Sequence, residues 1–403
     1  MATGTPVWTR HAALIVSLCF AINMIDGMDV VIMSYIAPAL AADWGVAPDA
    51  LGIVFSAGLL GMALGGIFLA PLADRFGRRR LILAALTLMS IGMITSGFVA
   101  NLPTLIAARM VVGAGIGTVL ATMAALAAEA APAGRQNMAV GVVQAGYPLA
   151  AVFTGLIAAQ AIPHWGWQPL LLAAGLGTVI MLPIAWIVLP RMRPLATDSA
   201  PPPALRTLFS EDLRTRTLWL WVAVFTGLMV LYFIVSWIPK LSIEAGLSET
   251  NGIYAGALYN LGAFVGTMVM SYLSVRVHLG RLIAVLLVLA GIAMLVFGTM
   301  RMSVATTLTV AFLIGVTLQG GYNGIWPLAA SVYPAERRAT GIGWAIGIGR
   351  SGAVIGPLIG GYLLAANTPL SVLFAVYCVP LAVCALAALM VSRPKHDIAE
   401  VSQ

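Results

Sequence analysis

Long apolar runs, separated by short polar segments, fill almost the whole chain. Reading from Arg10, we find twelve runs that each suit a transmembrane helix, which takes about 20 mostly apolar residues. They lie near residues 13–40, 51–72, 81–100, 103–128, 137–160, 168–189, 218–239, 252–275, 281–300, 304–332, 340–365 and 370–391. The pattern therefore predicts an all-α integral membrane protein with twelve spans.

One longer polar stretch divides these runs six and six. Residues 190–216 contain Pro201-Pro202-Pro203 and most of the charge in their neighbourhood. We therefore predict an N-terminal six-helix bundle over 1–189, a cytoplasmic central loop over 190–216 and a C-terminal six-helix bundle over 217–403.

Two short motifs recur at almost the same offset. Leu72-Ala73-Asp74-Arg75 aligns with Leu273-Ser274-Val275-Arg276 at an offset of 201, and Pro132-Ala133-Gly134-Arg135 aligns with Pro334-Ala335-Glu336-Arg337 at 202. Two independent matches of this kind indicate an internal duplication. We expect the two bundles to be related by a pseudo-two-fold axis along the membrane normal.

Composition agrees with a membrane location. Hydrophobic residues make up 61% of the chain and charged residues 9%, against about 25% charged residues in ordinary soluble proteins. A soluble domain of this size could not bury so much apolar surface. This excludes a soluble enzyme, a disordered regulator and a nucleic-acid binder. Cys19, Cys378 and Cys384 lie in apolar runs without metal-ligand or disulfide spacing, so no metal site is expected.

The basic residues orient the spans. With both termini in the cytoplasm, 17 of the 21 Lys and Arg residues fall in inner segments. The outer loops hold only Lys240 and Arg301, and Arg109 and Arg350 lie inside spans. This bias follows the positive-inside rule and predicts cytoplasmic termini. It also accounts for the net charge of +7 without a nucleic-acid partner.

Two acidic residues lie well inside a span. Asp26 and Asp29 are three residues apart in the first run, so they share one helix face, and Asn23 extends that polar stripe. Charged groups at this depth are costly and usually functional. We interpret the pair as acids that take up and release a coupling proton. The alternative is structural, with one aspartate permanently paired to a buried arginine.

Arg350 lies near mid-depth of the eleventh run, among Gly347, Gly349 and Gly352. Its planar guanidinium suits a carboxylate, so we interpret Arg350 as a substrate anchor. A permanent internal salt bridge to Asp26 or Asp29 is the alternative. The two states could also alternate, with substrate displacing an aspartate that then binds a proton.

Aromatic and amide side chains inside other runs are candidates for contacts with a bound ligand. In the tenth run Gln319, Asn323 and Trp326 have i, i+4, i+7 spacing and share a face, with Tyr322 beside them. Further candidates from three other runs are Gln144, Tyr147, Tyr232 and Tyr259. Each could instead serve helix packing.

The chain resembles the major facilitator superfamily. Leu72-Ala73-Asp74-Arg75-Phe76-Gly77-Arg78-Arg79-Arg80 is similar to its first signature loop, and Arg109-x-x-x-Gly113-x-Gly115-x-Gly117 to its second signature. There are departures, since Ala70 replaces the usual opening glycine and Val275 replaces the aspartate of the second copy.

A finer resemblance is to the aromatic acid:H⁺ symporters of that superfamily. Asp26-Gly27-Met28-Asp29 resembles their Asp-Gly-x-Asp motif, and the segment from Tyr333 to Trp344, continuing through Arg350 to Pro357, is similar to theirs. The resemblance implies proton coupling through Arg109 as well as the acidic pair; a structural pairing is the alternative for Arg109. It also implies a cytoplasmic gate made by Asp74, Arg75, Gly77, Arg78 and Glu129; the alternative for this loop is a plain topology anchor.

These observations predict a transporter of the bacterial cytoplasmic membrane rather than an enzyme or a channel. The expected activity is proton-coupled uptake of an aromatic carboxylate such as a hydroxybenzoate, by a monomer that needs no cofactor besides the proton. The alternatives are a symporter of a non-aromatic acid such as muconate and a drug:H⁺ antiporter. Neither H-E-x-x-H nor G-x-S-x-G, the signatures of common hydrolases, is present.

Overall fold

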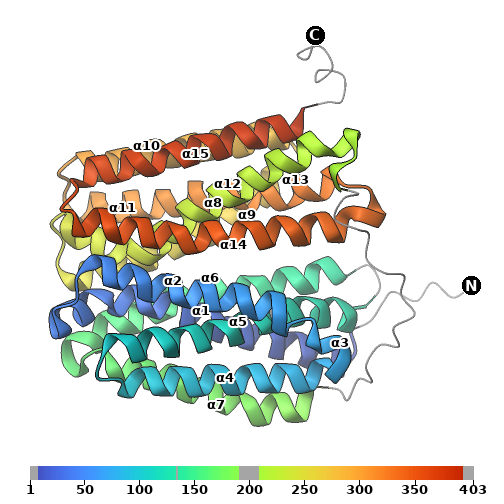
Figure 1. Cartoon of the computed structure of the whole chain (residues 1–403), viewed down its shortest axis with the longest axis horizontal. Coiled ribbons are helices and arrows are strands. Elements are labelled where there is room, and N and C mark those ends of the chain that lie inside the picture. The colour runs from blue at the N-terminus through green and yellow to red at the C-terminus, as the bar shows by residue number, and fades with distance from the viewer. Residues whose placement is uncertain (1–7, 133–134, 190–207, 394–403) are drawn as a thin grey trace, which may run out of the picture. The chain divides into compact units, whose positions relative to one another are not determined.

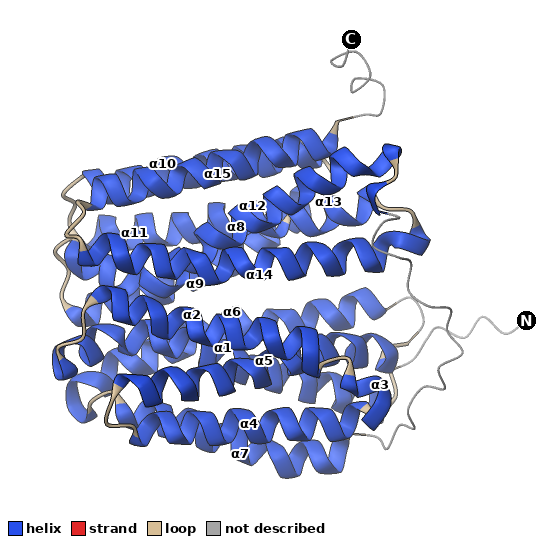
Figure 2. Cartoon of the chain, viewed as in Figure 1, coloured by secondary structure: helices blue, strands red, loops and turns tan. Residues whose placement is uncertain are grey.

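The computed structural model describes residues 8–132, 135–189 and 208–393, and the regular elements in these segments are helices (Figure 2). Twelve of them, taken singly or as continuous runs, are long and apolar enough to cross a membrane. Each overlaps one predicted span, so the prediction of twelve transmembrane helices is confirmed. The chain divides into two compact units, Met1–Asp198 and Ser199–Gln403.

The first unit is a bundle of helices whose axes run roughly side by side (Figure 1). Helix α1 packs against α6, α2 against α5, and α4 against both α5 and α7. The elements are α1 (Arg10–Trp44), α2 (Pro48–Leu64), η1 (Gly65–Leu69), α3 (Leu72–Phe76), α4 (Arg78–Phe98), α5 (Leu102–Ala130), α6 (Gln136–Trp165) and α7 (Gln168–Val188).

The second unit repeats this order of packing. Helix α8 packs against α14, α9 against α11 and η3, and α10 against both α11 and α15. The elements are α8 (Glu211–Glu244), α9 (Glu249–Leu273), α10 (Leu279–Thr299), α11 (Val304–Ile314), η3 (Gly315–Gln319), α12 (Gly320–Asn323), α13 (Ile325–Val332), α14 (Ala335–Ala365) and α15 (Leu370–Ser392).

Helix α8 begins at Glu211, whereas the sequence pattern placed residues up to 216 in the central loop. A hydropathy pattern finds only the apolar part of a helix. Backbone hydrogen bonding continues through charged residues outside the membrane, so a helix extends beyond its span.

Close helix crossings occur at equivalent positions in the two units. A Cβ on Gly61 would lie 2.1 Å from the carbonyl oxygen of Met110, and a Cβ on Gly262 would lie 2.1 Å from that of Phe312. Gly262 follows Gly61 by 201 positions, and Phe312 follows Met110 by 202. The predicted duplication is therefore confirmed in the packing of α2 on α5 and of α9 on α11.

The same offsets hold elsewhere. Gly113 approaches the carbonyl of Gly58 as Gly315 approaches that of Tyr259, with Cβ-to-oxygen distances of 2.0 Å in both. Gly97 meets Gln168 and Leu172, and its counterpart Gly298 meets Leu370 and Phe374. Side chains in the two units can therefore be compared position by position.

The tenth span is not one regular helix. The π-helical segment η3 follows α11, and α12 ends at Asn323 just before Gly324. A π-helical segment shifts the hydrogen-bond register and often occurs at functional sites. Here η3 lies immediately before α12, which carries Tyr322 and Asn323.

Candidate functional site

Asp26 and Asp29 lie inside α1 and are buried, with exposed fractions of 1% and 0%. Helices α2, α5, α6 and α7 all pack against α1. None of the four carboxylate oxygens of the pair has a hydrogen-bond partner among the described residues. Since buried polar atoms in proteins are normally hydrogen-bonded, this pair needs an explanation beyond packing.

Arg109 of α5 lies beside the pair. Its Nη2 donates to the backbone carbonyl oxygen of Asp29 at 2.7 Å, and its Nη1 lies 2.9 Å from the sulfur of Met93. The guanidinium and the Asp29 carboxylate also interact electrostatically. Arg109 is thus held by a backbone oxygen and a thioether, close to a carboxylate that it does not hydrogen-bond. Sequence reasoning missed Met93, because a methionine in an apolar run gives no polar signal.

Asn23 and Gly27 of α1 join this helix to α6. Asn23 Nδ2 donates to the carbonyl oxygen of Val143 at 2.7 Å. Gly27 packs on the backbone of Tyr147, where a Cβ would lie 2.6 Å from the carbonyl oxygen. The Gln144 side chain is exposed, and that of Tyr147 is partly buried.

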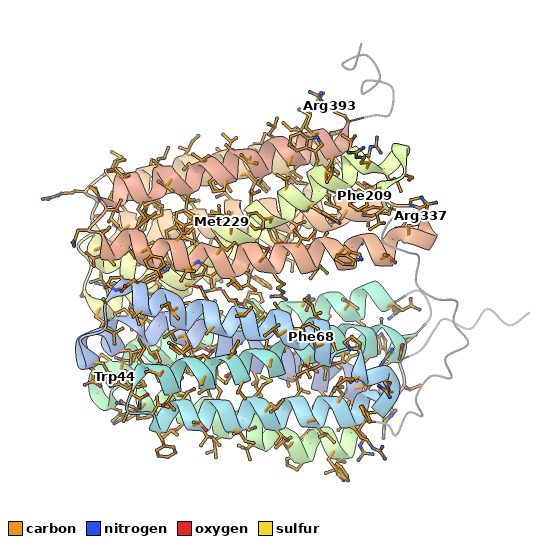
Figure 3. The ribbon with its side chains drawn as sticks, in the orientation of Figure 1. Trp44, Phe68, Phe209, Met229, Arg337 and Arg393 are labelled. Atoms are coloured by element: carbon orange, nitrogen blue, oxygen red, sulfur yellow. The ribbon has the colours of Figure 1, made fainter. Side chains whose placement is uncertain are left out.

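A second polar cluster lies in the second unit. Arg350 of α14 donates from Nη1 to the hydroxyl of Tyr232 on α8 at 3.4 Å. The Tyr322 hydroxyl on α12 is within electrostatic range of both, and that of Tyr259 on α9 is within range of Tyr232. Tyr232 lies about one turn beyond Met229, which Figure 3 labels near the middle of α8. Four helices thus contribute an arginine and three phenols, which we call the Arg350 cluster: Tyr232, Tyr259, Tyr322 and Arg350.

The Tyr322 ring is held in place. It packs edge-on against Trp326, with ring centroids 5.8 Å apart. Its Cδ2 occupies the space beside Gly227, where a Cβ would lie 2.8 Å away. Gly227 was another residue that the sequence analysis missed, although it occupies the position of Asp26 in the duplication, at an offset of 201.

The polar and aromatic residues of the tenth span contact one another and α9. Gln319 Nε2 donates to Asn323 Oδ1 at 3.3 Å, and Asn323 Nδ2 donates to Thr267 on α9 at 2.7 Å. Trp326, which the spacing grouped with these amides, contacts Tyr322 instead. The expected proximity of Gln319 and Asn323 is present, and a shared ligand-facing surface with Trp326 stays a prediction.

The loop before α4 brings together part of the predicted gate. Gly77 has φ +86°, a conformation that favours glycine, and it separates α3 from α4. Arg78 forms an ion pair with Glu129 at the end of α5. Arg75 is exposed, and the side chain of Asp74 lies outside the described residues. Of the loop arginines, Arg78 makes the contact with Glu129; the gating role of this contact stays a prediction.

Polar contacts also join the helices at one end of the second unit. Tyr333 donates to Thr217 at 3.2 Å, and Arg337 donates to Ser210 at 3.3 Å. Burial raises the pKa of Tyr333, so its hydroxyl remains a donor at neutral pH. Figure 3 shows Arg337, Phe209 and Arg393 at the same end of this unit. Across the described residues, no three His, Cys, Asp or Glu side chains are grouped as metal ligands.

Comparison with known proteins gives consistent matches. The sequence profile described as "Major Facilitator Superfamily" matches residues 18–350. The chain is 33% identical to a gallate transporter of Pseudomonas putida, covering 93% of this chain and 91% of that one. It is 31% identical to the 4-hydroxybenzoate transporter PcaK of Pseudomonas aeruginosa (95% and 93%) and 30% identical to a 3-(3-hydroxy-phenyl)propionate transporter of Escherichia coli (91% of each).

Solved structures match the fold. A bacterial homologue of the human lysosomal transporter Spinster, in an inward-facing and occupied conformation, aligns with a TM-score of 0.77 at 15% identity, covering 99% of this chain and 98% of that chain. A D-xylose-proton symporter aligns with a TM-score of 0.76 at 14% identity, covering 93% and 97%.

Proposed function

The chain belongs to the Major Facilitator Superfamily, and within it we propose a proton-coupled symporter that takes up an aromatic carboxylate, such as a hydroxybenzoate, by alternating access. It is a multi-pass transporter rather than an enzyme, and its similar relatives carry the names of aromatic-acid transporters. The proposed location is the cytoplasmic membrane of a bacterium. The single observation that supports proton coupling is the buried pair Asp26 and Asp29, whose carboxylates accept no hydrogen bond from the described residues.

The physical argument begins with the cost of buried charge. An ionised carboxylate without a hydrogen-bonded partner is expensive inside a protein in a membrane, whereas a protonated one is neutral. Arg109 lies close enough to stabilise an ionised Asp29, but its two described contacts are with the Asp29 backbone and Met93. A small rearrangement of side chains could therefore exchange a neutral acid for an ion pair. This is the change that a reversible proton site requires.

The Arg350 cluster is the proposed binding site of the aromatic carboxylate. A guanidinium is a planar cation that pairs well with a carboxylate, and that of Arg350 lies beside the Tyr232 phenol. The surrounding phenols and Trp326 offer an aromatic environment with few polar groups, which suits an aromatic acid. The acids lie in the first unit and Arg350 in the second. We propose that substrate binding in one unit and proton binding in the other are energetically linked.

The same contacts disfavour a non-aromatic dicarboxylate such as muconate. That substrate would need a second basic group inside the spans, and Arg109 is the candidate. Arg109 is buried beside Asp29 and engaged by the backbone and Met93. Its charge is therefore better placed to serve Asp29 than a second substrate carboxylate.

The energetics limit the stoichiometry. One proton moving with one monoanion transfers no net charge, so only the pH difference drives accumulation. A second proton would add about 2.3 kcal/mol per 100 mV of membrane potential. Two adjacent acids make this second stoichiometry a measurable alternative.

Proteoliposome uptake under an inward proton gradient tests the proposal. The substrates are labelled benzoate, 4-hydroxybenzoate, 3,4-dihydroxybenzoate and muconate. We expect an aromatic acid to accumulate and a protonophore to abolish the accumulation. Accumulation of muconate alone would discard the aromatic substrate while keeping symport. Uptake driven by an outward proton gradient would indicate an antiporter.

A further inference from the structure

Two phenol hydroxyls in the Arg350 cluster have no hydrogen-bond partner among the described residues: those of Tyr259 and Tyr322. The exposed fractions of the two residues are 0% and 3%. Buried hydroxyls are almost always paired, because an unpaired one loses its hydrogen bonds to water and gains none. Two such groups in one cluster point to a ligand that supplies the missing partners.

Packing contacts hold the Tyr322 ring and the Tyr259 backbone. Tyr322 is held between Gly227 and Trp326. The backbone of Tyr259 meets Gly315, where a Cβ would lie 2.0 Å from the Tyr259 carbonyl oxygen. The Tyr322 ring is therefore preorganised for recognition and loses little freedom when a ligand binds, while the close crossing fixes the position of Tyr259 along α9.

The duplication shows that the scaffold does not require phenols here. Tyr259 corresponds to Gly58 at an offset of 201, and Tyr322 corresponds to Leu120 at an offset of 202. The first unit forms the same glycine-lined crossing with glycine and leucine at these positions. Helix packing therefore does not explain the two hydroxyls.

We propose that Tyr259 and Tyr322 recognise hydroxyl groups on the substrate ring, so that the protein selects hydroxylated aromatic acids over unsubstituted ones. This inference rests on the proposed function, in which Arg350 holds the carboxylate. A phenol both donates and accepts, so it can pair with a ring hydroxyl in either sense. Benzoate would leave both tyrosine hydroxyls unpaired, and a site built for a hydroxyl rejects an analogue that lacks it.

The test is a competition series on the purified full-length protein in proteoliposomes. We expect 3,4-dihydroxybenzoate to bind more tightly than 4-hydroxybenzoate, and both more tightly than benzoate, with about tenfold or more between first and last. Tyr259→Phe and Tyr322→Phe keep the ring and remove only the hydroxyl. Each should weaken binding of the hydroxylated acids about tenfold and leave benzoate unchanged.

Tyr362→Phe is the matched control, since Tyr362 lies on α14 with Arg350 but is 54% exposed. It should leave the whole series unchanged.

Equal affinities of the wild type for benzoate and the hydroxylated acids would overturn the inference while leaving aromatic-acid transport intact. Equal weakening of all three acids in both variants would also overturn it, because the tyrosines would then serve ring packing. Failure of every aromatic acid to compete would instead reject the proposed function. The wild-type series decides the question even where a variant does not fold.

Discussion

The charged side chains inside the spans are distributed unequally between two units that otherwise pack alike. Asp29 corresponds to Val230 at an offset of 201, and Arg109 corresponds to Ala311 at an offset of 202. In the other direction, Arg350 corresponds to Pro148. The fold is therefore built without these charges in one of its two copies. Their presence in the other copy is better explained by transport than by helix packing.

The acidic pair yields a first prediction. Asp26→Asn and Asp29→Asn preserve side-chain shape but remove ionisation. We expect at least one of them to lower proton-driven accumulation more than tenfold while retaining substrate exchange, which moves no net proton. Uptake against a gradient and counterflow, measured on the same proteoliposomes, separate the two activities.

Asp49→Asn provides the control for this pair. Asp49 lies in the first turn of α2, near the end of a span, and should tolerate the change. Full accumulation by both pair variants would remove the acids from the coupling mechanism. Loss of exchange together with accumulation would point to a structural role.

Arg350 yields a second prediction. Arg350→Lys keeps the positive charge but loses the planar fork that pairs with a carboxylate. We expect KM for the aromatic acid to rise about tenfold or more with Lys, and uptake to be lost with Ala. Arg301→Lys, in the loop between α10 and α11, should behave as the wild type. An unchanged KM for Arg350→Lys and Arg350→Ala would exclude the carboxylate-anchor role.

At the scale of elements, hydropathy was sufficient to locate the spans because each apolar run must cross the bilayer. It could not reveal η1, η3 or the break at Gly324, which depend on backbone hydrogen-bond register rather than side-chain polarity. It also could not reveal Met93, Thr267 or Gly227, since each acts on a residue of another helix. The chemically distinctive residues were predicted, and their neighbours were not.

The glycine crossings yield a third prediction. Gly113→Ala and its counterpart Gly315→Ala each place a Cβ 2.0 Å from a backbone oxygen, which cannot move aside as a side chain can. We expect each to destabilise its unit by about 1–3 kcal/mol or more, through separation of the helices. Thermal unfolding in detergent measures this loss as a lower Tm.

Gly177→Ala is the matched control, because no atom lies within 4 Å of its added Cβ. It should leave Tm unchanged or raise it slightly, since alanine favours a helix over glycine. Similar Tm values for all three variants would contradict the idea that these crossings depend on glycine.

At the scale of the whole molecule, the basic residues predict which ends of the spans face the cytoplasm. Helix α10 offers both ends for a direct test, because His278 and Arg301 flank it and both are exposed. A membrane-impermeant maleimide should label Arg301→Cys in intact cells and label His278→Cys only after permeabilisation. The native thiols of Cys19 and Cys384 are buried and that of Cys378 is partly buried, so the unsubstituted protein is labelled in parallel to measure the background. The reverse labelling pattern would place the termini outside.

The repeated crossings have an evolutionary consequence. A duplicated gene begins with two identical copies. Here the close helix crossings at Gly61 and Gly262 still match, whereas the polar residues inside the spans differ between the two units. The acidic pair and the Arg350 cluster, to which we assign the proton and the substrate carboxylate, are therefore encoded in separate halves of the gene. Recombination between relatives at the central segment would exchange the Arg350 cluster as a unit and leave the acidic pair unchanged, so it offers one route by which a substrate preference changes.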